Sequence, residues 1–321
     1  RMQTMEDIGY GLANGKIILM GEHSVVYGKP AIALPFDKVQ IESRIYKSEG
    51  PITIDCLYYK GALEEASDVI EGIRQLIQFV LTYLNQPVNG LHIKIDSNLP
   101  AQRGLGSSAA VSVAVVRSIF DAFKVPLSDE LLHYFVGIAE QIHHTNPSGL
   151  AATTISSNRA IFFQKEKGKS PILMQMDAIL VVADTGRVGQ TKQAVDEVRQ
   201  LWSDNPTIVN PILDRLGALT EEVRGFLKNN EVIRLGLAMT EAHTLLKKIN
   251  VSDEGLEFLV ETPLKNGALG AKLTGGGKGG CMIALTKSKE EAIHISKALL
   301  NAGAHHTWFY DLGEIIDEGN R

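Results

Sequence analysis

The sequence predicts an α+β protein of two domains. Its 321 residues are more than one hydrophobic core usually organises, and 44% of them are hydrophobic and 21% charged, as in ordinary globular proteins. Strand-like runs dominate the first third of the chain, and helical patterns fill most of the middle. The last quarter alternates helix and strand in a split β-α-β arrangement of ferredoxin type. We therefore expect two domains of different architecture, 1–180 and 181–321.

Apolar periodicity defines the elements expected before residue 190. Strands are expected at Lys16–Met20, Ala31–Pro35, Val39–Tyr46, Ile52–Tyr58 and Leu91–Ile95, with a helix at Ala66–Leu84. Helices are then expected at Ser107–Phe123 and Ser128–His143, and strands at Ala160–Gln164 and Ile179–Ala183. Ser128 is the expected N-cap of its helix, because acidic residues follow it directly.

The remaining chain begins with a long helical region from Gln190 to about Lys248. It is expected to break near Asp204–Pro211, a stretch that contains two prolines. The last elements are expected to be a helix at Gly255–Asn266, a strand at Ala271–Thr274, a strand at Cys281–Thr286, a helix at Lys289–Gly303 and a strand at His306–Leu312.

Composition narrows the class of ligand. The formal net charge is −5 and no block of lysine or arginine occurs, which argues against nucleic acid or an anionic membrane as the main partner and favours a small molecule. No apolar run reaches the roughly 18 residues that span a bilayer, and the amino-terminal residues lack the layout of a signal peptide. Cys56 and Cys281 form no disulfide framework. We expect a cytoplasmic protein.

The most informative motif is the run Gly-Leu-Gly-Ser-Ser-Ala-Ala at residues 104–110. It lies between an extended stretch, His92–Leu99, and the apolar helical run Val111–Phe123. Glycines let backbone N–H groups converge on an anion, and the positive end of the following helix points to the same place. The motif predicts a phosphate cradle. The alternative for such a run on its own is a glycine-rich turn with serines that cap the helix.

A second motif surrounds the first strand. Lys16 begins an apolar run that ends in Gly21-Glu22-His23. A Glu-His pair at the end of a strand can exchange hydrogen bonds with a hydroxylated substrate. Lys16 alone would be read as a solvated lysine at a strand edge, but the combination with Glu22 and His23 favours a site.

A third motif is the loop Gly275–Gly280 between two expected strands, in which five of six residues are glycine. Such a loop loses conformational entropy on folding unless backbone must approach something closely. It is not a Walker P-loop, because the Gly-x-x-x-x-Gly-Lys-Ser/Thr pattern is absent. A loose hairpin turn is the alternative, although a hairpin needs only one or two glycines.

Between these motifs, Glu140 lies near the end of a helix, where its charge opposes the helix dipole. A compensating cation is an attractive explanation, and Mg²⁺ would use one carboxylate, a serine hydroxyl and nucleotide phosphates. A surface carboxylate is the alternative. His143 and His144 are expected to flank the helix end structurally, because their spacing with acidic residues does not indicate a zinc site.

With the three motifs in order, nearly the whole chain resembles the GHMP kinases. Gly21–Gly28 is similar to the first motif of the mevalonate kinase branch, Pro100–Ala110 to the second, nucleotide-binding motif, Asn146–Leu150 to the Asn-Pro-Ser-Gly turn, and Gly270–Gly280 to the third motif. The compact length resembles the short bacterial form. The resemblance implies an amino-terminal ATP-binding domain like ribosomal protein S5 domain 2, a ferredoxin-like carboxy-terminal domain, and an active site between them.

The resemblance also implies a reaction, the transfer of the γ-phosphoryl group of ATP to the C5 hydroxyl of mevalonate in isoprenoid biosynthesis. Lys16 would lie beside that hydroxyl and the γ-phosphate as a catalytic residue. Mg²⁺ would be held by Ser108 and Glu140. ATP would contact Gly104, Leu105, Gly106, Ser107, Ser108, Gly275, Gly276 and Gly277. The substrate would contact Glu22, His23, Ser148, Gly149, Thr185 and Thr191.

One position departs from the family pattern. The family places a catalytic aspartate after the Pro-Ser-Gly-Leu turn, and this chain has Ala151 there. Since a general base contributes roughly 10²–10⁴-fold, we expect substrate binding with slow turnover. Either an aspartate was deliberately replaced, or this is a natural homologue that has lost catalysis and acts as a small-molecule sensor. Slow transfer supported by Lys16 and Mg²⁺ alone is a third possibility.

Two further expectations complete this interpretation. Another GHMP kinase, such as a phosphomevalonate kinase, is the alternative enzyme, and it would need additional cationic side chains for a second phosphate. A monomer or homodimer is expected, because nothing in the sequence implies a larger assembly.

Overall fold

The computed structural model describes residues 6–98, 102–144, 147–174 and 176–313. Pro100 and Asn146, two positions of the predicted motifs, lie outside the described residues. The structure contains two compact units, one within Arg1–Lys16, Pro35–Ala101 and Gly106–Arg159, the other within Ile17–Leu34, Gln102–Leu105 and Ala160–Arg321. The units interleave along the chain because strands β1 (Gly9–Met20) and β2 (Ala31–Lys47) each contribute residues to both.

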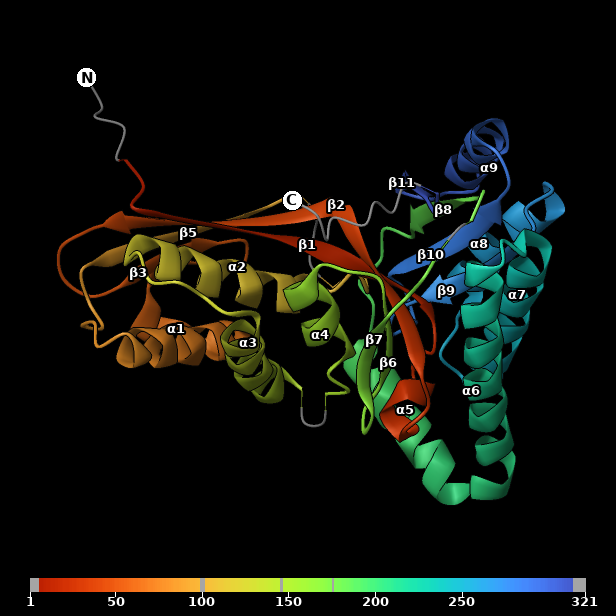
Figure 1. Ribbon diagram of the computed structural model, residues 1–321, viewed down its shortest axis with the longest axis horizontal. Coiled ribbons are helices and arrows are strands. Elements are labelled where there is room, and N and C mark those ends of the chain that lie inside the picture. The colour runs from red at the N-terminus through yellow and green to blue at the C-terminus, as the bar shows by residue number, and fades with distance from the viewer. Residues whose placement is uncertain (1–5, 99–101, 145–146, 175, 314–321) are drawn as a thin grey trace. The chain divides into compact units, whose positions relative to one another are not determined.

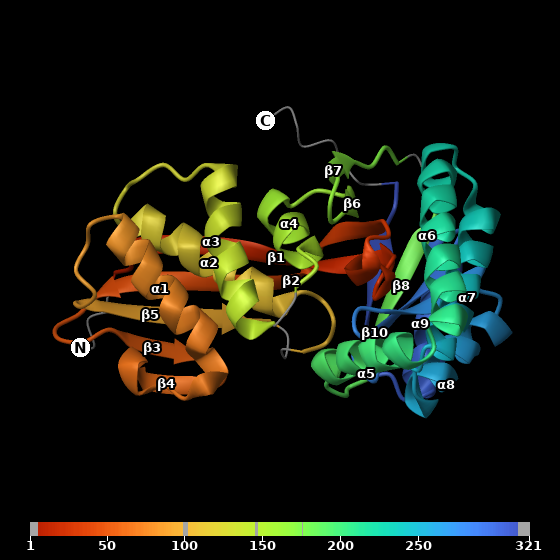
Figure 2. The same ribbon diagram turned by 90° about the horizontal axis from the view of Figure 1, so that it is seen from below.

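The first unit is a sheet with helices on one face (Figures 1 and 2). β2 pairs antiparallel with β5 (Leu91–Ser97), and β5 pairs parallel with β3 (Thr53–Cys56), which forms a hairpin with β4 (Tyr59–Ala62). Helices α1 (Glu71–Tyr83), α2 (Ser107–Ala122) and α3 (Asp129–His143) cover the sheet, and α4 (Leu150–Ser157) follows them. Short 3-10 turns occupy Leu63–Glu65 and Asp68–Ile70.

The core of the first unit lies between this sheet and its helices. Alternate residues of β2 and β5 point into it, among them Ile41, Ile45 and Ile93, which are fully buried. The helices supply apolar stripes at helical spacing, as in Leu76 and Val80 of α1. Burial of these side chains therefore fixes both the strand register and the helix orientation.

The second unit contains a four-stranded antiparallel sheet in the order β11-β8-β10-β9. Its strands are β8 (Ile179–Asp184), β9 (Gly270–Thr274), β10 (Cys281–Thr286) and β11 (His306–Asp311). Four helices separate β8 from β9, namely α5 (Thr191–Asp204), α6 (Pro206–Lys228), α7 (Val232–Lys248) and α8 (Glu254–Lys265), and α9 (Lys289–Asn301) separates β10 from β11. This strand order confirms the predicted ferredoxin-type arrangement.

Three further short segments belong to the second unit. β6 (Ile161–Gln164) pairs with the first residues of β2 and forms a hairpin with β7 (Gly168–Pro171). A 3-10 turn, Ser24–Tyr27, follows β1. None of the described helices combines the length and apolar character that crossing a bilayer requires.

Several element boundaries differ from the prediction. β1 begins at Gly9 rather than Lys16, because Gly9 and Gly11 have no side chain and α2 packs directly against them. A Cβ on Gly11 would lie 2.2 Å from the Ala114 carbonyl oxygen. The expected strand Ile52–Tyr58 is the shorter β3, which ends at Cys56 and is followed by β4, a strand that was not predicted. The expected helix Ala66–Leu84 begins as an α-helix only at Glu71.

The helical region after residue 190 breaks in two places. The first break, between Asp204 and Pro206, was predicted, and Pro206 occupies the first turn of α6 where its missing N–H does no harm. Pro211 does not end the helix and lies inside α6. The second break, at 229–231, was not predicted, nor were helix α4 and strand β7. Ser128 does cap α3, where its hydroxyl oxygen accepts from the Leu131 N–H at 3.1 Å.

Candidate active site

The glycine-rich turn leads into the amino-terminal end of α2. Gly104 and Gly106 have φ values of 78° and 76°, in the left-handed region that glycine tolerates best, and Gly106 is the N-cap of the helix. Ser107 and Ser108 form the first turn of α2, where helical N–H groups lack intrahelical acceptors and attract anions. Leu105 is 2% exposed, so any nucleotide contact there would come from its backbone.

Ser108 and Glu140 meet from two helices of the first unit. The Ser108 hydroxyl donates to Oε1 of Glu140 at 3.2 Å, and Nε2 of His144 lies 3.7 Å from Oε2. Glu140 is 6% exposed and lies in the last turn of α3, as predicted. Burial raises the pKa of its carboxyl, and nearby positive groups, His144 first, oppose that rise.

This pair fits a magnesium ion. A buried carboxylate whose ionised form is disfavoured gains from a cation, and a serine hydroxyl beside it offers a second hard oxygen ligand. Among the described residues, no group of three or more His, Cys, Asp and Glu side chains could hold a metal by itself. A magnesium ion on Ser108 and Glu140 would complete its coordination with phosphate oxygens and water.

Lys16 lies against the same turn. Lys16 is 5% exposed, and a Cβ built on Gly106 would lie 2.8 Å from its Cγ and 2.7 Å from Cδ1 of Ile155. Only glycine at position 106 therefore lets the aliphatic part of Lys16 and the side chain of Ile155 pack against the glycine-rich turn. The lysine predicted to be catalytic is thus a buried side chain beside the predicted cradle, and not a solvated lysine at a strand edge.

Ala151 occupies the first turn of α4. Residues four apart lie on one face of a helix, so a side chain at 151 lies on the face of Ile155, which packs at Gly106 beside Lys16. The methyl group of Ala151 packs on the core of the first unit. Position 151 therefore lies on the same face of α4 as Ile155, and this chain has no carboxylate there.

The turn before α4 is shaped by Ser148 and Gly149. Gly149 is the N-cap of α4 with φ of 87°, and the Ser148 hydroxyl oxygen accepts from the Leu150 N–H at 3.2 Å. The Ser148 hydroxyl therefore has a structural role at the helix start. The substrate contacts predicted for both residues stay a prediction.

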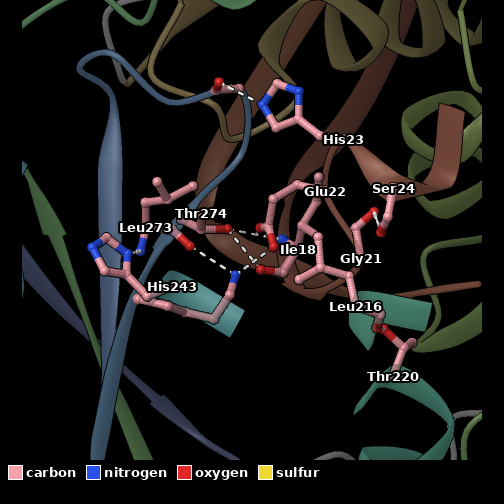
Figure 3. A network of polar contacts seen from close by, with 12 residues as sticks. Ile18, Gly21, Glu22, His23, Ser24, Leu216, Thr220, His243, Leu273 and Thr274 are labelled. Atoms are coloured by element: carbon pink, nitrogen blue, oxygen red, sulfur yellow. Dashed lines mark hydrogen bonds and ion pairs between the residues drawn. The ribbon is translucent and has the colours of Figure 1, made fainter. Parts of the chain in front are cut away.

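In the second unit, Glu22 and His23 form the turn after β1. Glu22 is 3% exposed, and its Oε1 accepts from Nζ of Lys272 at 2.6 Å (Figure 3). His23 is 6% exposed and adopts φ of 64°, which is uncommon for a residue other than glycine. The Nε2–H of His23 donates to the Gly276 carbonyl at 2.8 Å. Burial lowers the pKa of His23 to about 4, so the ring is neutral at pH 7.

The two glycine-rich motifs touch within the second unit. A Cβ on Gly275 would lie 2.8 Å from the Gly104 Cα, and one on Gly276 would lie 2.3 Å from Oγ1 of Thr191. The Gly277 carbonyl accepts from the Gln190 N–H at 3.4 Å. These approaches require residues without side chains, so the loop is a packed segment and not a loose hairpin turn.

Thr185 forms two hydrogen bonds with the last residue of this loop. Its hydroxyl donates to the Gly280 carbonyl at 2.8 Å, and its backbone N–H donates to the same oxygen at 2.9 Å. Thr191 is the exposed first residue of α5, beside Gly276. The structure thus brings Thr185 and Thr191 to the glycine loop, and their contact with substrate stays a prediction.

Two charged residues of this region were not identified from the sequence. Lys272 is fully buried in β9, and Arg103 pairs with the buried Asp184 at 3.2 Å. A signal for Lys272 was present, because a lysine in the middle of a short apolar strand is either at an edge or paired. No comparable signal marks Arg103, whose partner is 81 residues away in sequence.

A phosphate-binding helix end beside a buried carboxylate that suits Mg²⁺ is typical of enzymes that transfer phosphoryl groups. Family comparison agrees: residues 71–157 match the description "GHMP kinases N terminal domain" and residues 223–305 match "GHMP kinases C terminal". The chain belongs to the GHMP kinases. The matched ranges lie within the predicted domains 1–180 and 181–321, whose boundary stays a prediction.

Several proteins of similar sequence are named mevalonate kinase. A protein named mevalonate kinase from Pyrococcus furiosus is 35% identical over 88% of this chain and 90% of its own length. One of the same name from Thermococcus onnurineus is 35% identical over 96% of each chain. Among solved structures, L. major mevalonate kinase in complex with R-mevalonate has a TM-score of 0.80 at 29% identity, covering 96% of this chain and 98% of its own.

Proposed function

We propose that this chain binds ATP and mevalonate and transfers the γ-phosphoryl group of ATP to the C5 hydroxyl of mevalonate, slowly because of Ala151. The observation that carries the proposal is the hydrogen bond between Ser108 and the buried Glu140, in the same unit as Lys16 and the Gly106 turn. The mevalonate kinases among its relatives support the choice of substrate.

In the reaction, the C5 hydroxyl oxygen forms a bond to the γ-phosphorus while the bond from that phosphorus to the bridging oxygen breaks and ADP leaves. Such transfers depend mainly on positioning and on balancing charge. The N–H groups at the start of α2 and the Lys16 ammonium balance phosphate charge. The Glu22 carboxylate and the neutral His23 would exchange hydrogen bonds with the hydroxylated substrate.

When bound, Mg²⁺ supplies positive charge to the phosphate oxygens. Ser108 and Glu140 would hold it. The raised pKa of Glu140 means that ion binding and deprotonation of this carboxyl are coupled, so affinity for Mg²⁺ falls as the pH drops.

The hydroxyl proton must leave during the transfer, and because Ala151 offers no acceptor it would pass to water or to a phosphate oxygen. A general base contributes roughly 10²–10⁴-fold, so the deficit should appear in turnover and not in substrate affinity. Lys16 lowers the free energy of the alkoxide by its charge but, as an ammonium group, accepts no proton.

The test is an assay of ADP release with mevalonate, ATP and Mg²⁺, which compares the chain with Ala151→Asp and with Ala151→Asn. We expect Ala151→Asp to raise kcat at least about a hundredfold with little change in KM, and Ala151→Asn to leave it low. High turnover by the chain itself would contradict the account of Ala151. ATP hydrolysis at a rate that mevalonate does not affect would contradict the proposal that mevalonate is the substrate.

A second candidate function rests on Ala151 alone. A GHMP fold without its general base can act as a small-molecule sensor that binds ligand without converting it. This alternative predicts that Ala151→Asp binds the same small anions as the parent and gains no turnover. Lys16, Glu22, His23, Ser108 and Glu140 are all retained, and Lys16 in particular favours the kinase, because a sensor that only binds its ligand has no need of a catalytic lysine.

A further inference from the structure

Strand β9 is the edge of the four-stranded sheet, and its free edge faces α7. The N–H groups of Ala271 and Leu273 point away from β10, and side chains of α7 accept both. Thr240 Oγ1 accepts from Ala271 at 3.2 Å, and Nδ1 of His243 accepts from Leu273 at 3.1 Å. Two N–H groups on the free edge of β9 are thereby satisfied, and both bonds hold β9 against α7.

His243 is itself held in one orientation. Its Nε2–H donates to Oε1 of Glu257 at 2.7 Å, and that carboxylate oxygen also accepts from the Ser252 hydroxyl at 2.6 Å. Because Nδ1 accepts from a backbone N–H, the ring carries its proton on Nε2. Burial lowers the pKa of His243, so the ring is neutral at pH 7.

Lys272 lies between these two anchored residues and reaches Glu22. Its Nζ donates to Oε1 of Glu22 at 2.6 Å and to its neighbour's carbonyl, Leu273 O, at 2.7 Å (Figure 3). Lys272 is 0% exposed and Glu22 3% exposed. Thr274, two residues along β9, donates to the Ile18 carbonyl at 2.8 Å, so strand β1 is tied to the same strand just before the Glu22 turn.

A buried ion pair of this kind is weak evidence for stability. Removing two charges from water is unfavourable, and apolar residues of similar size often serve as well or better. Burial lowers the pKa of Lys272, and the charge and hydrogen bond of Glu22 oppose that change. The pair therefore needs an explanation other than folding.

We propose that Lys272 is a positioning residue, which balances the charge of the Glu22 carboxylate and fixes its orientation for binding the hydroxylated substrate. This inference rests on the proposed function, since it gives Glu22 the substrate contact. The anchoring of β9 by Thr240 and His243 holds the lysine in place. Lys272 itself acts through Glu22 and need not touch the substrate.

The test is a double-mutant cycle of mevalonate binding, measured by calorimetry on the full chain, with Lys272→Met, Glu22→Gln and the double variant. Each single variant should weaken mevalonate binding at least about tenfold. The double variant should bind no more weakly than Glu22→Gln alone, because Lys272 has no effect once the carboxylate is gone. ATP–Mg²⁺ affinity should change less than about twofold throughout.

Lys29→Met is the matched control, because Lys29 forms an ion pair with Asp214 at 2.7 Å in the same unit and is partly exposed. It should bind mevalonate like the parent. Should Lys272→Met fail to fold, the double variant, which leaves neither charge unpaired, still gives the comparison with Glu22→Gln.

Two results would overturn the inference while leaving the proposed function intact. One is additive losses in the cycle, and the other is equal losses of mevalonate and ATP affinity in folded Lys272→Met. A parent chain that binds ATP but no mevalonate would overturn the proposed function and the inference together.

Discussion

Gly104 and Gly275 lie backbone against backbone, with only 2.8 Å between the Gly104 Cα and a Cβ built on Gly275. The two residues are far apart in sequence and belong to the two glycine-rich motifs. A side chain at position 275 would displace Gly104, and one at position 104 would lie 3.1 Å from the Thr274 carbonyl oxygen. Gly104 and the glycine loop are therefore packed together within the second unit.

Gly275→Ala should disrupt this packing. The new methyl group would meet backbone atoms at 2.8–2.9 Å, and φ at this position is 82°. We expect a lower melting temperature by about 2–4 °C and at least about tenfold weaker ATP binding, measured by calorimetry.

Gly50→Ala is the control that introduces the same backbone strain without a steric contact. Gly50 has the same φ of 82°, but a Cβ there meets nothing within 4 Å. It should lose stability through backbone strain and keep ATP affinity. If both variants bound ATP equally well, the contact between the two motifs would have no bearing on nucleotide binding.

Gly106→Ala should displace Lys16. The added methyl would lie 2.8 Å from the lysine Cγ and 2.7 Å from Cδ1 of Ile155, and both side chains are confined by the core. In the Ala151→Asp background we expect kcat to fall about 10²-fold, because small displacements of reacting groups are costly. The measurement is ADP release at saturating mevalonate.

The control for this variant is Gly137→Ala in the interior of α3, where a Cβ meets nothing within 4 Å. Alanine is the better helix former by about 0.8–1.0 kcal/mol, so this variant should be stabilised and fully active. Unchanged kcat in Gly106→Ala would show that Lys16 tolerates the shift.

Glu140→Gln should make the folded protein more stable and should weaken Mg²⁺ binding. Because burial raises the pKa of Glu140, its ionised form is disfavoured in the folded state, and this group lowers stability as the pH rises through its usual value. Glutamine retains an acceptor for Ser108 without the charge. We expect the melting temperature at pH 8, without Mg²⁺, to rise by about 1–3 °C.

The same variant should lose the stabilisation that Mg²⁺ adds to the ATP complex, measured as the difference in melting temperature with and without the ion. Glu166→Gln, at an exposed carboxylate outside the site, is the control and should keep that difference. If the Glu140→Gln variant still responded fully to Mg²⁺, the ion would bind at a site other than Ser108 and Glu140.

The sequence predicted the elements with strong periodicity and missed those held by tertiary contacts. Helix α2 and the strands of the four-stranded sheet follow apolar patterns, and the structure has them close to the predicted bounds. The first half of β1 is rich in glycine, which disfavours strands, and only its packing on α2 explains it. The short helix α4 likewise depends on the turn at Gly149 and on the surrounding core.

In the candidate site too, residues with local sequence signatures were predicted and those defined by tertiary contacts were not. Gly106, Ser108 and Glu140 were found because glycine turns, helix starts and helix ends have local signatures. Lys272 acts through Glu22, which lies 250 positions away, and no local pattern encodes that contact. Residues that contact each other across long sequence separations are fixed by the fold, and a single sequence does not reveal them.

The neutral ring of His23 should make the protein sensitive to acid. Burial lowers its pKa from 6.5 to about 4, so between these values the unfolded chain binds one more proton than the folded protein. Stability from this group is therefore complete above about pH 6.5 and is lost as the pH falls toward 4, by up to about 1.4 kcal/mol per pH unit.

His23→Gln, which keeps an N–H donor for the Gly276 carbonyl, should lose less stability between pH 7 and pH 5 than the parent, measured by urea unfolding at both values. His306→Gln, at an exposed ring, should follow the parent. Because His143 and His243 also have pKa values lowered by burial, the variant should keep part of the acid response. Identical pH dependence in His23→Gln and the parent would mean that His23 is charged in the folded protein or reaches water.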